Sequence, residues 1–353
     1  MKLKKLTALG LSLALVLALA AGCTQKPAEA QTPTPAPTPS ATAAPTPAPS
    51  PTPESEAERP QVNLAMLKGP TGIGAAKLMA DNDADATLNR YTVEVAAQPT
   101  DLVGKLTSGE LDMAAMPTNL AASLWNKTGG GVELVALNTL GVLYILEKGD
   151  TVRSMADLAG RTVLATGQGA NPEYVLNYLL RQNGLEPGKD VTIEWKTSDE
   201  VSALMASGEA DLCMLPVPAS TAVLMQNQDV RAALDLTREW ENAGAAGVFT
   251  MGCVVVRSDF AKENPEAVAN FLTDYAASID YVKTNVDEAA ELVAQYGITP
   301  KAAIAKAAIP QANLVCITGE DMRQIQDYYE VLYAADPASI GGNIPDDSFY
   351  FIP

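Results

Sequence analysis

The chain has 353 residues and a formal net charge of −18, with 42 acidic against 24 basic side chains and no histidine. Such acidity argues against nucleic acids and anionic lipid headgroups as partners, because both need a basic surface. The lack of histidine excludes Ser-His-Asp and Cys-His catalysis, the common zinc-hydrolase motifs and histidine metal sites. We therefore expect no metal and no catalytic residue.

The first 22 residues have the pattern of a lipoprotein signal peptide. Lys2, Lys4 and Lys5 precede an apolar segment over residues 6–21, which is too short to span a bilayer comfortably and ends in Leu-Ala-Ala-Gly before Cys23. This ending resembles a lipobox, in which Cys23 becomes the first mature residue and carries fatty acyl chains such as palmitate. The alternative is an ordinary signal peptide with an incidental cysteine. The pattern predicts lipid anchoring at the outer face of the cell membrane, extracellular or periplasmic.

A proline-rich tract follows Cys23. Residues 24–60 consist mainly of Pro, Thr, Ala and Ser, a composition that favours extended polyproline II and cannot build a core. At about 3.1 Å per residue, the tract would reach on the order of 100 Å when fully extended. We interpret residues 23–60 as the lipidated cysteine and a semi-rigid tether.

From residue 61 onward, strand-like and helix-like stretches alternate, which is typical of an α/β architecture. The remaining length of roughly 290 residues suffices for one large unit or two lobes. No later apolar run reaches the roughly 18 residues of a membrane-spanning helix. In chain order we expect strands at 62–67, 91–95, 113–116, 132–137, 140–146, 162–165, 191–195 and 248–256, and helices at 72–80, 100–108, 172–183, 265–282 and 287–296.

A short motif occurs twice, 99 residues apart. Ser-Gly-Glu-Leu-Asp at 108–112 precedes Pro117, and Ser-Gly-Glu-Ala-Asp at 207–211 precedes Pro216. In both copies a helix would end at a left-handed glycine cap, a short strand would follow the Asp, and Pro would stop that strand before a new helix. The same flanking pattern favours a repeated βαβ half over a chance recurrence.

Three cysteines besides Cys23 lie in apolar runs. Cys213, Cys253 and Cys316 are best interpreted as buried strand residues. Because their number is odd and no CxxC pair exists, we expect no disulfide framework.

Several segments resemble the second lobe of extracellular solute-binding proteins. The stretch 154–163 (Ser-Met-Ala-Asp-Leu-Ala-Gly-Arg-Thr-Val) is similar to the sequence that opens that lobe, and residues 167–169, 190–192 and the second Ser-Gly-Glu motif with Pro216 also match it. The closest branch is that of substrate-binding lipoproteins of nitrate/sulfonate/taurine-type ABC importers, which includes thiamine-precursor binders. The resemblance implies the two-lobed type II periplasmic-binding-protein fold with two interlobe crossovers. Lobe one would take residues 61–140 and 250–353, and lobe two would take residues 141–249.

The resemblance also implies a function. The protein would capture a small organic solute between its lobes and deliver it to the permease and ATPase subunits of an ABC importer, without being an enzyme. The second lobe has Met214-Leu215-Pro216 where the family has an aromatic Trp-x-Pro, and the cleft loops contain no arginine, so a sulfonate or nitrate ligand is disfavoured. One alternative is an enzyme on the same scaffold, of the pyrimidine-precursor or futalosine type. The pyrimidine synthases rely on a histidine and a cysteine-rich motif, which this chain lacks. Another alternative is a sensory or adhesive lipoprotein.

Ligands of open α/β sheets bind beyond the carboxyl ends of strands, near helix N-termini. Four segments of this chain fit that description, and each has the alternative of a plain turn. The candidate ligand-binding residues are Lys68, Pro70, Thr71 and Gly72, then Pro117, Thr118 and Asn119, then Gly167, Gln168, Gly169 and Asn171, and finally Pro216 and Pro218. Tyr144 and the pair Asn138-Thr139 are weaker candidates.

The candidate segments say little about the charge of the ligand, and they lack the motifs of a nucleotide cofactor site. Lys68 is the only charged residue in them, and it would either pair with a ligand carboxylate or be solvated. A GxGxxG motif starting at Gly167 is incomplete because Pro172 takes the third glycine position, and no GxxxxGK[ST] motif exists. The segments suit a neutral or singly anionic, partly aromatic solute, and we expect no cofactor.

Overall fold

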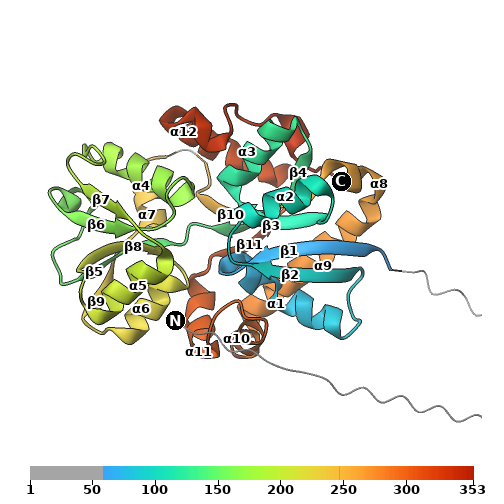
Figure 1. Cartoon of the computed structure of the whole chain (residues 1–353), viewed down its shortest axis with the longest axis horizontal. Coiled ribbons are helices and arrows are strands. Elements are labelled where there is room, and N and C mark those ends of the chain that lie inside the picture. Colours follow the sequence, from blue (N-terminus) through green and yellow to red (C-terminus); the bar gives the residue numbers. More distant parts are fainter. Residues whose placement is uncertain (1–58, 246) are drawn as a thin grey trace, which may run out of the picture. The chain divides into compact units, whose positions relative to one another are not determined.

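The computed structural model describes residues 59–245 and 247–353. The predicted signal peptide, Cys23 and residues 24–58 lie outside the described residues. These described residues form two β-sheets, which Figure 1 shows side by side. The first sheet has six strands in the order β11-β4-β10-β3-β1-β2, and the second has five in the order β7-β6-β8-β5-β9. The predicted α/β fold class is confirmed.

The strands are β1 (Gln61–Leu67), β2 (Arg90–Ala96), β3 (Met113–Pro117), β4 (Val132–Leu140), β5 (Leu143–Lys148), β6 (Thr162–Ala165), β7 (Thr192–Trp195), β8 (Leu212–Pro216), β9 (Val230–Asp235), β10 (Thr250–Arg257) and β11 (Leu314–Ile317). The expected break between strands at 132–137 and 140–146 is therefore misplaced. β4 continues to Leu140 because its polar residues have partners: Asn138 Nδ2 donates to the Tyr275 hydroxyl (3.1 Å), and Thr139 Oγ1 donates to Asn138 Oδ1 (3.0 Å).

The α-helices are α1 (Pro70–Asp83), α2 (Thr100–Ser108), α3 (Thr118–Thr128), α4 (Asn171–Gln182), α5 (Ser198–Ser207), α6 (Ala219–Gln226), α7 (Leu236–Asn242), α8 (Ser258–Glu263), α9 (Pro265–Thr284), α10 (Val286–Gln295), α11 (Ala302–Ala308) and α12 (Gln326–Ala335). One face of α9 is apolar and buried, through Val268, Phe271, Tyr275, Ile279 and Val282. Among the described residues, no helix is long and apolar enough to cross a membrane.

Two connections join the sheets. The chain passes from β4 to β5 through Gly141 and Val142, and it returns from α7 to β10 through residues 243–249. We call residues 143–242, which form the second sheet and its helices, the second half. The first sheet and its helices are the first half. The exact lobe boundaries at residues 140/141 and 249/250 stay a prediction.

Both faces of the first sheet are covered by helices, because its central strands are apolar on alternate sides. Leu64 and Met66 of β1 pack with α1 and α9 in one core cluster, whereas Ala65 and Leu67 belong to another that includes α2, α3 and α12. This second cluster continues without a break into α4 and α7 of the second half. The two halves therefore share one apolar core on that side.

The repeated motif corresponds to a repeated structure. Gly109 and Gly208 have φ of 81° and 77° and end α2 and α5 as left-handed caps, as predicted. The strands β3 and β8 that follow each lie between a parallel strand (β1 or β6) and an antiparallel strand (β10 or β5). Pro117 and Pro216 end these strands, and α3 and α6 begin within three residues.

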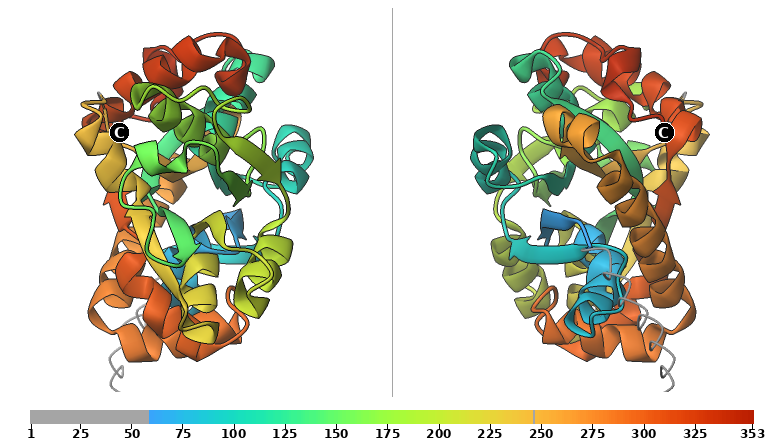
Figure 2. Two further views of the ribbon diagram at one scale, coloured as in Figure 1. Left: turned by 90° about the vertical axis from the view of Figure 1, so that its left-hand side faces the viewer. Right: turned by 90° about the vertical axis from the view of Figure 1, so that its right-hand side faces the viewer.

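The C-terminal segment contacts both halves. α12 packs against α4, and α11 packs against α6. In the left view of Figure 2, the red C-terminal helices lie on one side of the green and yellow second half, and the orange helices lie on the opposite side. Asn264 directly precedes α9, but its side chain makes no capping hydrogen bond to the helix, and its Nδ2 donates to the Phe260 carbonyl (3.2 Å).

All three described cysteines lie in strands, as predicted, and they are free thiols. Cys213 and Cys253 are buried, whereas Cys316 is half-buried. Burial raises the pKa of Cys213 to about 12 and that of Cys316 to about 11. These thiols are therefore protonated and unreactive near neutral pH.

Candidate functional site

The four predicted segments lie at the starts of four helices. They connect β1 to α1, β3 to α3, β6 to α4 and β8 to α6, and within each sheet the two strands concerned are parallel. The carboxyl ends of these strands therefore lie at the same edge of their sheet. In the described part of the chain, no side chain caps the first turn of α1, α3, α4 or α6.

The segments of the two halves meet at two points. At the first, Asn171 Nδ2 of α4 donates to Thr118 Oγ1 of α3 (2.9 Å) and to the Met251 carbonyl of β10 (3.2 Å). At the second, a Cβ placed on Gly69 would lie 4.0 Å from Pro218 Cδ. Beside Pro218, Val217 is buried in the same core cluster as β1 and α1. The fold thus brings all four segments to the boundary between the halves.

The first segment is explained largely by the β1–α1 turn. Thr71 Oγ1 bonds both the amide and the carbonyl of Leu67 (3.3 Å each), so this hydroxyl is already satisfied. Gly72 permits the close approach of helix to strand, because a Cβ there would lie 2.4 Å from the Leu67 carbonyl oxygen. Lys68 is exposed and Pro70 is half-buried as the first residue of α1.

In the third segment, Asn171 is fully buried whereas Gln168 and Gly169 are exposed. Gly167 and Gly169 have φ of 85° and 73°, which makes the turn before α4. The Gly169 amide donates to Glu173 Oε2 (2.6 Å), so a carboxylate of the chain already lies at this helix start. A second anion would be repelled there.

Thr118 takes part in hydrogen bonds through both its hydroxyl and its carbonyl. Its hydroxyl donates to the Thr250 carbonyl (3.1 Å) and accepts from Asn171, and its carbonyl accepts from the Tyr329 hydroxyl (2.9 Å). Its neighbour Asn119 points elsewhere, since its Nδ2 donates to the Ser339 carbonyl (3.3 Å). Pro117, Pro216 and Pro218 are half-buried. The weaker candidate Asn138 is occupied inside the first half, and Tyr144 is half-buried on β5.

Buried oxygens without a partner gather around these segments. Such an atom costs about 1–3 kcal/mol if nothing bonds it, so it marks a place that takes a polar group. Side-chain oxygens of this kind, with no hydrogen-bond partner among the described residues, belong to Asn119, Asn171, Asn177, Ser220, Thr221, Thr237, Thr250 and Tyr328. Most of them lie in or next to the segments or at the end of the second connection, whereas Asn177 lies within α4, Thr237 on α7 and Tyr328 on α12.

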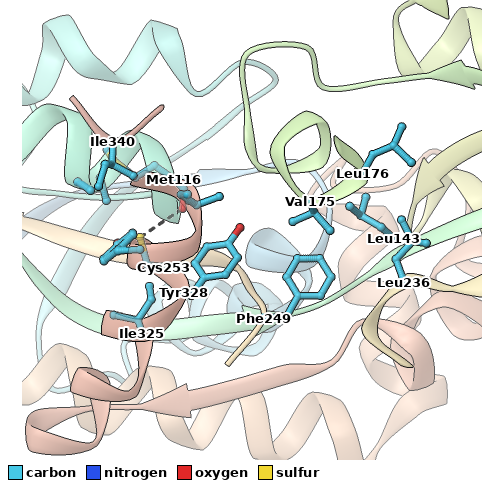
Figure 3. Close-up of a cluster of buried hydrophobic side chains, with 14 of the residues drawn as sticks. Met116, Leu143, Val175, Leu176, Leu236, Phe249, Cys253, Ile325, Tyr328 and Ile340 are labelled. Atoms are coloured by element: carbon cyan, nitrogen blue, oxygen red, sulfur yellow. Dashed lines mark hydrogen bonds between the residues drawn. The ribbon is translucent and has the colours of Figure 1, made fainter. Parts of the chain in front are cut away.

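The sequence analysis missed the tyrosines of α12. The ring of Tyr328 packs at a tilt against Trp240 (5.4 Å between ring centroids) and Phe249 (6.1 Å), and it is fully buried. In Figure 3 its hydroxyl points to the space between Met116 of β3 and Val175 of α4. Burial raises the pKa of Tyr328 and of Tyr329, so both phenols stay protonated and able to donate. The only signal in the sequence is a Tyr-Tyr pair on a short amphipathic helix.

Two surface hollows lie away from the four segments. One of about 480 Å³ is bounded by Arg323, Gln326 and the turn at 345–347, and another of about 410 Å³ lies between Leu140, Lys283 and β11. Neither includes a predicted site residue. Within residues 59–245 and 247–353, no cluster of three acidic or cysteine side chains could hold a metal ion.

Solved structures of low sequence identity share the fold. An ABC transporter protein from Parabacteroides distasonis has a TM-score of 0.69 at 22% identity, covering 83% of this chain and 98% of its own. The periplasmic aliphatic sulphonate binding protein SsuA from Escherichia coli has a TM-score of 0.64 at 15% identity, with 81% and 92% covered. A Candida albicans gene product described as having the generic periplasmic binding protein fold has a TM-score of 0.52 at 16% identity, with 82% and 93% covered.

These likenesses confirm the periplasmic-binding-protein fold expected from the resemblance. No curated protein matches the chain. The family model described as "NMT1/THI5 like" matches residues 92–289, which include three of the four site segments and more than half of the chain. The protein therefore belongs to the NMT1/THI5-like family.

Proposed function

We propose that this protein is a non-enzymatic receptor that captures a small organic solute between its two halves and delivers it to an ABC permease. The observation that carries the proposal is the meeting of four uncapped helix starts from two sheets around buried oxygens that lack partners among the described residues. Such a boundary can bury a small polar molecule from both sides, and the two connections allow the halves to separate.

The descriptions of the solved structures with this fold support this role. The Escherichia coli protein is named as a sulphonate binder and the Parabacteroides distasonis protein as an ABC transporter. Since their identity to this chain is at most 22%, they support a binding role without naming the solute.

The enzyme alternative has less support. The chain has no histidine, and burial raises the pKa of each described cysteine, so neither a His-based nor a thiolate mechanism is available. An enzyme would return a chemically altered product after incubation, whereas a receptor would release the solute unchanged. Mass spectrometry of the released molecule distinguishes the two.

A thermal-shift screen tests the binding role. Saturating solute at about 100 times Kd should raise the free energy of unfolding by about 2.7 kcal/mol. The screen should cover amines, amides, heterocycles, sugars, carboxylates and sulfonates. If none of these classes shifts the melting curve, the receptor proposal fails. Permease and ATPase genes beside this one would favour import over a sensory role.

Lipid anchoring at Cys23 is the second part of the proposal. The sequence Leu-Ala-Ala-Gly-Cys supports it, as does the tether that follows. We expect Cys23→Ala to abolish the incorporation of radiolabelled palmitate and to move the protein from the membrane fraction to the medium or periplasm. Cys316→Ala is the matched control and should leave both unchanged. Palmitate labelling that survives Cys23→Ala would contradict the anchor.

A further inference from the structure

Asn171 connects the two halves, and the orientation of its amide group is fixed by its neighbours. The Met251 carbonyl can only accept a hydrogen bond, so the atom of Asn171 that faces it at 3.2 Å must be the nitrogen. Thr118 Oγ1 donates its only proton to the Thr250 carbonyl, so it too must accept from Asn171. Both donors of the amide are therefore used within the first half.

This arrangement leaves the oxygen of the Asn171 amide without a partner in the described part of the chain. Asn171 Oδ1 is fully buried and has no hydrogen-bond partner among the residues that the structure describes. An amide oxygen can only accept, so whatever group faces it must offer an N–H or O–H. Sulfonate and nitrate carry only acceptor oxygens at neutral pH, so they would leave this atom unpaired and would be repelled by it.

The surrounding charges act in the same direction. The carboxylate of Glu173 accepts from the Gly169 amide (2.6 Å), two residues before Asn171, and so places a negative charge at the start of α4. Other buried oxygens that lack a partner among the described residues include the hydroxyls of Thr250, whose carbonyl accepts from Thr118, and of Tyr328, which are neutral and can donate or accept. The surroundings thus favour a neutral group over an anion.

We infer that Asn171 is a specificity-determining residue whose Oδ1 accepts a hydrogen bond from a neutral N–H or O–H group of the solute, while its Nδ2 holds the first half. The inference rests on the proposed solute-binding function. It narrows the solute class to neutral molecules with a donor and rejects acceptor-only anions. Because one side chain contacts both the solute and the opposite half, donor binding and closure of the halves are coupled through it.

The test uses the purified full chain and three probes: the small-molecule filtrate of yeast extract, sodium methanesulfonate and sodium nitrate. Molecules retained after washing are identified by mass spectrometry, and the Kd of each is measured by calorimetry. For the wild type, we expect retention of neutral molecules with an N–H or O–H and no retention of either anion. Asn171→Leu should weaken binding of the retained molecule at least about tenfold, because its donor is left unpaired.

Two further variants, Thr118→Val and Asn171→Asp, separate the roles of the two amide atoms. Thr118→Val removes the hydroxyl that faces Nδ2 but keeps Oδ1, so we expect it to weaken binding less than Asn171→Leu does. Asn183→Leu is the matched control at the other end of α4, where the side chain is exposed, and should bind like the wild type. Asn171→Asp keeps Oδ1 but turns a second oxygen toward the Met251 carbonyl, so it should weaken binding even if Asn171→Leu does not fold.

The outcomes are distinguishable. Retention of methanesulfonate or nitrate by the wild type overturns the inference, whatever the variants do. A retained neutral molecule whose Kd is the same for the wild type, Asn171→Leu and Asn171→Asp also overturns it, while leaving the receptor role intact. A wild type that retains nothing from any probe overturns the receptor role and the inference with it.

Discussion

Glu147, on β5, is an almost fully enclosed carboxylate, with 1% of its side chain exposed. Its Oε2 accepts from Arg231 Nη2 (2.6 Å), and its two oxygens accept from the amides of Thr151 and Val152. Burial alone would raise the pKa of Glu147. The hydrogen bonds from Thr151 and Val152 and the charge of Arg231 outweigh burial and hold its pKa below the usual range.

We expect Glu147→Gln to lower the free energy of unfolding by about 2–3 kcal/mol at pH 7, because Arg231 and the loop amides lose their anion in a buried place. Arg231 is itself partly exposed, so the loss stays below that of a fully buried pair. Urea denaturation at pH 7 measures it. The control Glu186→Gln removes a half-exposed partner of Arg181 and should cost less than about 0.5 kcal/mol.

The same side chain contributes to acid sensitivity. A lowered folded-state pKa gives stability that is present above the unfolded pKa of about 4.5 and is lost as the pH falls through the folded pKa. The difference between wild type and Glu147→Gln should therefore shrink below about pH 4.5. A constant difference down to pH 3 would show that packing, not charge, accounts for the effect.

At the scale of elements, the β1–α1 turn leaves no room for a side chain at Gly72, near the start of α1. A Cβ on Gly72 would lie 2.4 Å from the Leu67 carbonyl oxygen and 3.1 Å from Ile298 Cγ2. We expect Gly72→Ala to destabilise the protein by about 2 kcal/mol, because overpacking of up to about 3 kcal/mol exceeds the gain of about 1 kcal/mol in helix propensity.

Gly104 provides the matched control for this substitution. It is an exposed residue within α2, and a Cβ there has no described atom within 4 Å. Gly104→Ala should therefore raise the free energy of unfolding by up to about 1 kcal/mol, and the melting temperature with it. If both variants shift the melting temperature in the same direction, the steric argument for Gly72 is wrong.

The repeated motif shows how far local sequence could predict these elements. The left-handed caps at Gly109 and Gly208 and the strands after them follow from local patterns. The cations that cover the caps could not be predicted. A Cβ on Gly109 would lie 2.3 Å from Arg257 Nη1, and Lys148 Nζ donates to the Gly208 carbonyl (3.1 Å). Arg257, at the end of β10, follows the first copy of the motif along the chain, whereas Lys148, at the end of β5, precedes the second copy.

The candidate site, too, could be predicted from the sequence only in part. Helix starts after parallel strands pointed to Thr118 and Asn171, because strand order and turn residues are local signals. The direction of the Asn171 amide depends on carbonyls about 80 residues away, and Tyr328 reaches the boundary only because α12 packs on α4. Contacts set by packing between distant elements leave no periodic signal in the sequence.

At the scale of the whole molecule, the titratable groups define a window of constant stability. With no histidine, no side chain with an ordinary pKa titrates between about pH 6 and 7.5. Above this window, burial raises the pKa of Tyr275, Tyr328 and Tyr329 and of the thiols Cys213 and Cys253. The folded protein therefore keeps protons that the unfolded chain releases.

A raised folded-state pKa gives stability that is complete below the unfolded pKa, about 9 for Cys and 10 for Tyr, and is lost as the pH rises toward the folded value. We expect the free energy of unfolding to be flat from about pH 6 to 7.5 and to fall by several kcal/mol by about pH 10.5, as measured by urea denaturation at constant ionic strength. Each buried phenol contributes about 1.4 kcal/mol per pH unit above pH 10. Tyr328→Phe should make the alkaline fall shallower, whereas Tyr333→Phe, at an exposed position of the same helix, should not. Stability that stays constant up to pH 10.5 would mean that the phenols and thiols reach water in the folded protein.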